Sequence, residues 1–82
     1  MRFVSFGGGM RFRKRTSQVD ATRWFAEGDH ERVERRDGKW AVATPEGWRS
    51  VKPGDWIVRD ERGNCWPMED GLFMHCYEPA AD

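Results

Sequence analysis

The stretch RVERRDGKWAVAT, residues 32–44 of this 82-residue chain, contains a turn sequence between two candidate strands. At its centre, the pair Asp37-Gly38 suits a type I′ turn, in which both residues have positive φ. After the turn, Trp40 and Val42 alternate with smaller or polar residues, as in a strand that buries one face. The stretch therefore predicts a β-hairpin. Its two strands are Arg32–Arg36 and Lys39–Thr44.

A short helix competes with the first strand of this hairpin. Asp29 could cap a helix over His30–Arg36, and Glu31 could pair with Arg35 four residues later. Val33 is the single apolar residue of that segment, so the helix would have no face to bury. We therefore expect the hairpin there.

Further turn sequences follow at intervals typical of short antiparallel strands. Each contains residues that turns prefer, such as Gly with Pro, Asn or Asp. The turns are Pro45-Glu46-Gly47, Pro53-Gly54-Asp55 and Glu61-Arg62-Gly63-Asn64, and the strands that follow them are 48–51, 56–59 and 65–68. Upstream of these turns, residues 11–25 are predicted to be extended chain. Downstream of them, Leu72–Tyr77 is predicted to form a final strand or a short turn of helix.

The predicted fold is mainly β. We expect a small, twisted antiparallel sheet or a partly open barrel with room for one short helix, and an α+β fold is the alternative. A chain of this length forms one domain, which we place at 10–82. Residues 1–9 contain a glycine run, Gly7-Gly8-Gly9, directly before a second methionine, Met10. We interpret 1–9 as a disordered leader or as an extension upstream of a native start at Met10.

Composition narrows the classes of function. Fourteen basic and fourteen acidic residues give a formal net charge of zero, which excludes a uniformly basic nucleic-acid binder and a uniformly acidic nucleic-acid mimic. No apolar run approaches the roughly 18 residues of a membrane span, so we expect no membrane association. Five Trp and five Phe supply a dense core, and a tryptophan left exposed would be the natural anchor of a partner interface.

The charges are unevenly distributed along the chain. Residues 1–15 hold five bases and no acid, whereas 61–82 hold one base and five acids. The first segment could bind the phosphates of a nucleic acid, with its aromatic Phe12 stacked on a base, or it could bind an acidic partner. Alternatively, its bases pair with the acidic end within one sheet, or they guard a sheet edge. The bases in question are Arg11, Arg13, Lys14 and Arg15.

The sequence offers no assembled catalytic or metal-binding set. Metal ligands would have to come from His30, Cys65, His75 and Cys76, but the cysteines lack C-x-x-C spacing, and His75 and Cys76 are neighbours. We expect no enzyme activity, no cofactor and no metal. Because no secretory signal precedes them, both thiols are expected to be free in a reducing, cytoplasmic compartment.

Several short motifs follow one another in a characteristic order. They are Met10-Arg11-Phe12-Arg13-Lys14-Arg15, Val19-Asp20-Ala21-Thr22-Arg23-Trp24, Val51-Lys52-Pro53-Gly54-Asp55-Trp56-Ile57-Val58, Gly63 with Trp66-Pro67, and Phe73 with Tyr77-Glu78-Pro79. In this order they resemble a family of small uncharacterised proteins of phages, prophages and bacteria that is named for its Pro-Gly-Asp-aromatic motif (PGDY or PGDW). The resemblance extends from Met10 to about Ala80 and implies a start at Met10. It supplies no established activity.

Within that motif, Pro53 presets the turn and Gly54 takes a positive φ. Asp55 hydrogen-bonds the backbone ahead, and Trp56 enters the core. We therefore expect a structural role for these four residues. The resemblance, together with the lack of a catalytic set, predicts a non-enzymatic accessory protein of phage or prophage type that binds another protein. The alternative is a nucleic-acid-binding module. That module would use Arg11, Arg13, Lys14 and Arg15. The sequence does not indicate the oligomeric state of the protein.

Overall fold

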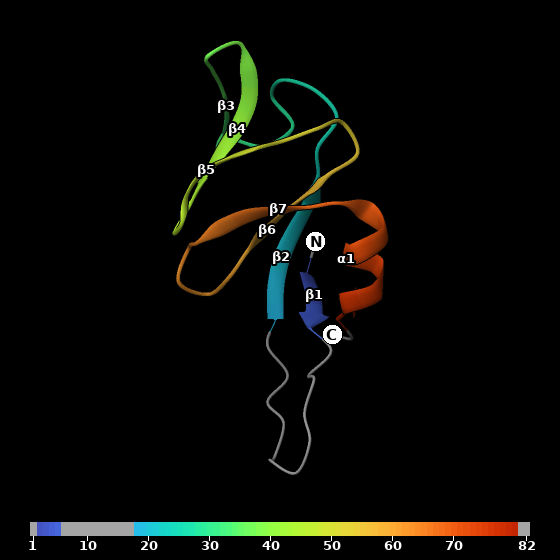
Figure 1. Ribbon diagram of the computed structural model, residues 1–82. Helices are drawn as coiled ribbons and strands as arrows, with labels where there is room; N and C mark the ends of the chain where they lie inside the picture. Colours follow the sequence, from blue (N-terminus) through green and yellow to red (C-terminus); the bar gives the residue numbers. More distant parts are fainter. Residues whose placement is uncertain (1, 6–17, 81–82) are drawn as a thin grey trace.

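The computed structural model describes residues 2–5 and 18–80, which form eight strands and one helix (Figure 1). The elements are β1 (Arg2–Ser5), β2 (Gln18–Arg23), β3 (Val33–Arg36), β4 (Lys39–Thr44), β5 (Gly47–Ser50), β6 (Trp56–Arg59), β7 (Cys65–Met68), α1 (Asp70–Cys76) and β8 (Tyr77–Pro79). A larger sheet has the order β7-β6-β2-β1-β8 and a smaller sheet the order β3-β4-β5, and every pairing is antiparallel. The prediction of a mainly β fold with a short helix is confirmed. The described strands form two sheets and do not close into a barrel.

The predicted hairpin forms β3 and β4 of the smaller sheet. Asp37 and Gly38 have φ values of 50° and 77°, and two positive values in succession define a type I′ turn. Val33 lies opposite Val42 across the two strands. The hairpin prediction is therefore confirmed, and the competing helix over His30–Arg36 is wrong. As a strand, the segment can place Val33 beside Val42 in the core, whereas a helix would bury Val33 alone.

Strand β1 lies inside the larger sheet, between β2 and β8. The side chain of Phe3 is only 3% exposed, and its ring makes edge-to-face contacts with Phe73 and Trp56 at centroid distances of 4.8 and 5.4 Å. The prediction that 1–9 is a disordered leader outside the domain is therefore wrong for Arg2–Ser5. A single buried aromatic in four residues gives no readable alternation, which is why sequence reasoning missed this strand. The glycine run lies outside the residues that the structure describes.

The core has two parts, which meet at β6. The part that joins the two sheets contains Trp24, Val33, Val42, Val51, Ile57 and Cys65. The part between the larger sheet and α1 contains Phe3, Val19, Ala21, Val58 and Phe73. Ile57 and Val58 are fully buried, and as neighbours on one strand they point to opposite faces. Strand β6 is thus covered on both faces, which explains why 56–59 is the most hydrophobic of the predicted strands.

Helix α1 packs beside the larger sheet (Figure 1). Its buried residue, Phe73, stacks between Trp56 and Tyr77, whose ring centroids are 4.2 and 5.0 Å away. The chain then continues directly as β8, which pairs with β1. For Leu72–Tyr77 the sequence predicts either a final strand or a short turn of helix. The structure contains both, since α1 ends at Cys76 and β8 begins at Tyr77.

Candidate functional site

The Pro53-Gly54-Asp55-Trp56 motif forms a tight turn that leads into β6. The N–H of Asp55 donates to the carbonyl of Lys52 at 3.0 Å, and Gly54 has a φ of 97°, as the third residue of a type II turn requires. The Asp55 carboxylate accepts a hydrogen bond from the N–H of Lys52 at 2.9 Å. The turn docks on the backbone of Trp24, which accepts from the Gly54 N–H and donates to the Asp55 carbonyl, both at 2.7 Å.

Two further residues, Arg23 and Asp70, hold the motif in place. The Nε of Arg23 donates to the Gly54 carbonyl at 3.0 Å, and its guanidinium lies 3.6 Å from the Asp70 carboxylate. Asp70 also accepts a hydrogen bond of 2.8 Å from the indole N–H of Trp56. The polar groups of the motif are thus used within the protein, to tie the turn to β2 and α1. Sequence reasoning missed Arg23 and Asp70 because only the folded sheet brings them together.

The basic cluster of Arg11, Arg13, Lys14 and Arg15 lies outside the residues that the structure describes, between β1 and β2 in the sequence. Its proposed contact with nucleic acid therefore stays a prediction.

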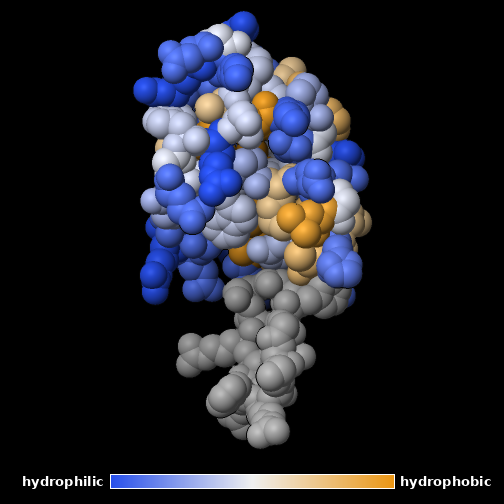
Figure 2. Space-filling model, in the orientation of Figure 1, coloured by the Kyte–Doolittle hydropathy of each residue, from blue (hydrophilic) through white to orange (hydrophobic). Residues whose placement is uncertain are grey.

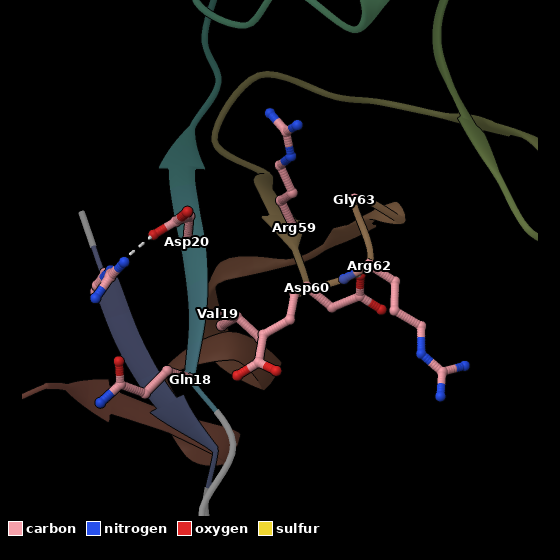
Figure 3. Close-up of a pocket in the computed structure, with 9 residues that line it drawn as sticks. Gln18, Val19, Asp20, Arg59, Asp60, Arg62 and Gly63 are labelled. Carbon is pink, nitrogen blue, oxygen red and sulfur yellow. Dashed lines mark hydrogen bonds and ion pairs between the residues drawn. The ribbon is translucent and has the colours of Figure 1, made fainter.

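A polar groove lies on the larger sheet, and Figure 3 shows the residues that line it. The guanidinium of Arg2 lies 3.6 Å from the carboxylate of Asp20, and that of Arg59 lies 3.5 Å from Glu31. The side chains of Arg59 and Arg62 point in different directions (Figure 3). Because two of these cations already have ion-pair partners and the arginines do not converge, the groove is not organised around one anion.

The outer face of the smaller sheet carries a more distinctive group of side chains. Trp40 and Val42 of β4 pack against the core, and side chains alternate along a strand, so Lys39, Ala41 and Ala43 point outward. Cross-strand pairing places the outward residues of β3 and β5 beside them. We call this surface the Trp48 face. It consists of Glu34, Arg36, Lys39, Ala41, Ala43, Trp48 and Ser50.

Trp48 is 46% exposed and is the most exposed of the five tryptophans. The guanidinium of Arg36 lies over its ring, 4.0 Å from the centroid, although β3 and β5 are on opposite sides of β4. The two side chains therefore meet over β4. Ala41 lies between the two strands on the same face and is only 7% exposed.

Glu34 holds Arg36 in this position, because its carboxylate lies 3.2 Å from the guanidinium. A cation–π contact at an exposed site contributes about 0.5–1 kcal/mol, and an exposed ion pair contributes up to about 1 kcal/mol. The two contacts together orient the indole and the guanidinium without any partner. Trp and Arg are also the residue types that most often dominate the energetics of protein–protein interfaces.

Among residues 2–5 and 18–80, three other large apolar side chains are exposed, namely Phe25, Leu72 and Met74. Figure 2 shows orange, hydrophobic side chains gathered at the level of α1, the helix that carries Leu72 and Met74. The guanidinium of Arg23 lies 5.2 Å from the ring centroid of Phe25, but that arginine belongs to the turn network. The Trp48 face is therefore the stronger candidate, because its aromatic–cation pair is not part of a structural turn.

The described residues contain no group of three or more His, Cys, Asp or Glu side chains that could hold a metal ion. Cys65 is buried and Cys76 half-buried, and both are free thiols. Burial raises the pKa of the Cys65 thiol above its usual value, so the group is protonated and a poor nucleophile at neutral pH. Within 2–5 and 18–80, no helix is long and apolar enough to cross a membrane.

No protein-family model matches the sequence, and no curated protein or solved structure matches it either. The resemblance to the family with the Pro-Gly-Asp-aromatic motif therefore stays a prediction, as do the non-enzymatic character and the cytoplasmic location.

Proposed function

We propose that the protein is a non-enzymatic binding module whose Trp48 face docks on another protein. The observation that carries this proposal is the stack of Arg36 on the exposed indole of Trp48, at 4.0 Å. Interface hot spots are enriched in these two residue types and are strongest where the side chains are already ordered in the free protein. Glu34 supplies that order here through its ion pair with Arg36.

The shape of the Trp48 face suits a protein surface better than a small molecule. Its central positions on β4 are Ala41 and Ala43, whose short side chains leave the middle of the face open to solvent, with one open hollow beside Trp48. Ligand sites for small molecules are concave and enclose most of the ligand. An open sheet face with one large exposed aromatic side chain matches the usual arrangement of an anchor residue surrounded by weaker contacts.

The same stack disfavours a base-stacking role for Trp48. Proteins that bind single-stranded nucleic acid use aromatic rings with a free face. In this protein the guanidinium of Arg36 covers one face of the indole. A nucleic-acid base on that face would have to displace the arginine from both Trp48 and Glu34.

The phage or prophage type of this accessory role rests on the family resemblance alone. The gene neighbourhood tests it most directly. Neighbouring genes for virion structure, host defence or replication would support the role and name the class of partner, whereas a stable housekeeping neighbourhood across hosts would contradict it.

Affinity capture from the native host tests the proposed function. The full chain and the variant Leu72→Ala, which alters an exposed side chain of α1, should recover the same protein in a stoichiometric amount. Trp48→Ala should weaken that complex by about 30-fold or more, as expected for the loss of a hot-spot tryptophan. A partner that Trp48→Ala retains, or the absence of any stoichiometric protein, would contradict the proposal. Circular dichroism of each variant establishes that it is folded.

A further inference from the structure

Two bases lie directly opposite each other on the Trp48 face. Arg36 and Lys39 are paired across β3 and β4, next to the hairpin turn. Like charges in directly opposite positions destabilise a strand pair. Glu34 compensates Arg36, but Lys39 has no ion-pair partner among residues 2–5 and 18–80.

A third base reaches the same region from β5. The hollow beside Trp48 is lined by Arg36, Asp37, Lys39, Ala41, Trp48, Arg49 and Ser50, so three bases and one acid surround it. Arg49 has its own ion pair with Glu46 at 2.8 Å. The uncompensated positive charge therefore lies around Lys39, next to an exposed indole.

We propose that the Trp48 face binds an acidic segment of the partner, a proposal that rests on the proposed function. A carboxylate of the partner lies between Arg36 and Lys39 and relieves the repulsion between them. An adjacent aliphatic side chain of the partner packs on the indole of Trp48. Such charge complementarity speeds association and fixes the register of the bound segment.

Nucleic acid fits this surface less well than an acidic peptide. A phosphate backbone presents closely spaced charges and is bound by extended tracks of Lys and Arg. On this sheet the bases are interrupted by Glu34, Asp37 and Glu46, and the charge of the whole chain is zero. A peptide with carboxylates between apolar residues matches the alternation of charge and aromatic surface.

Peptide selection tests this proposal. Peptides from a random library are selected for binding to the full chain, and those that also bind the variant Trp48→Ala are removed. The enriched peptides should contain Asp or Glu next to an aliphatic residue, and their affinity should fall as salt increases. Lys39→Gln should weaken the best peptide by about threefold or more. Lys52→Gln, which removes an exposed base that does not belong to the Trp48 face, should leave the affinity unchanged.

Three results would overturn the proposal: no enriched peptide, enriched peptides without an excess of acids, or equal binding by Lys39→Gln and the full chain. Displacement of the peptide by a tighter-binding oligothymidine would replace the acidic peptide with nucleic acid as the ligand. If affinity capture yields a partner that depends on Trp48 but not on Lys39, only the acidic-segment proposal fails. If capture yields no partner that depends on Trp48, both the acidic-segment proposal and the proposed function fail.

Discussion

The guanidinium of Arg36 lies 4.0 Å from the ring centroid of Trp48, although the two residues belong to strands that do not touch each other in the sheet. This relationship depends on Ala41, whose small side chain separates them on β4. It converts two long side chains, which would otherwise sample many rotamers, into an ordered surface feature.

The stack predicts a ring-current effect in solution. The side-chain protons of Arg36 should be shifted upfield in the NMR spectrum, because the guanidinium lies over the face of an indole. Trp48→Leu should return these resonances to ordinary values and should leave those of Arg62 unchanged. Arg36 resonances that do not respond to Trp48→Leu would show that the stack is not populated.

Phe3→Ala should strongly destabilise the protein. The ring is buried between Phe73 and Trp56, and a buried Phe→Ala substitution costs about 3–5 kcal/mol. Urea denaturation, monitored by circular dichroism, measures this decrease in the free energy of unfolding. Phe25→Ala, which removes an exposed ring, should change the free energy of unfolding by about 1 kcal/mol or less.

A chain that starts at Met10 should show a similar defect, because it lacks β1 and leaves β2 and β8 without a shared neighbour. The native start at Met10 is checked by mass spectrometry of the protein from its host, where a peptide that begins at Met1 would contradict it. Equal stabilities of the 10–82 chain and the full chain would instead contradict the structural role of β1.

Gly54→Ala should destabilise the protein by more than about 1 kcal/mol, because Ala resists the φ of 97° that the turn imposes. Gly71→Ala is the matched control. Gly71 lies in α1 without a positive φ, and an added methyl group would meet nothing within 4 Å. That substitution should be neutral or stabilising by up to about 1 kcal/mol. The same sign of change for both variants in thermal unfolding would count against a strained turn at Gly54.

His30 makes stability depend on pH. Its Nδ1 accepts a hydrogen bond from the N–H of Arg32 at 3.0 Å. Burial lowers the pKa of His30 below 6.5, while Glu31 opposes the shift and Arg59 and Arg32 reinforce it. The unfolded chain therefore binds this proton more readily than the folded chain does. As a result, the free energy of unfolding should fall as pH decreases from 6.5 to the folded-state pKa and then level off with respect to this group.

His30→Asn keeps a side-chain acceptor and removes the titration. Its stability should fall less steeply than that of the unchanged protein over the pH range just below 6.5, as measured by urea denaturation at a series of pH values. Parallel curves for the two proteins would rule out His30 as the cause.

Local turn chemistry made the smaller sheet predictable from sequence. Asp37-Gly38 and the alternation of Trp40 and Val42 identify the hairpin, because these features act within a few residues. The division into two sheets was not predictable, since it depends on distant pairings such as that of β2 with β6. Strand β1 was missed for a related reason, because its one core residue, Phe3, is recognisable only once Phe73 is packed against it.

The candidate site was predictable only in part. The alternation and the turn at Pro45-Glu46-Gly47 are sufficient to place Trp48 on the face opposite Trp40. These sequence features do not reveal whether another sheet or helix covers that face. Trp48 would be buried in the core if the face were covered and is exposed if it is not. The contact between Arg36 and Trp48 also required the sheet order, because the two residues lie 12 positions apart on non-adjacent strands.

Site-specific photocrosslinking in the native host tests whether the Trp48 face is the surface that docks on another protein. A photoreactive amino acid at Ser50 lies on the Trp48 face and leaves Trp48 and Arg36 intact, whereas one at Met74 samples the exposed surface of α1. We predict one specific crosslinked protein from position 50, lost when Trp48→Ala is added, and none from position 74. Crosslinking from position 74 alone, or crosslinking from position 50 that persists without Trp48, would contradict it.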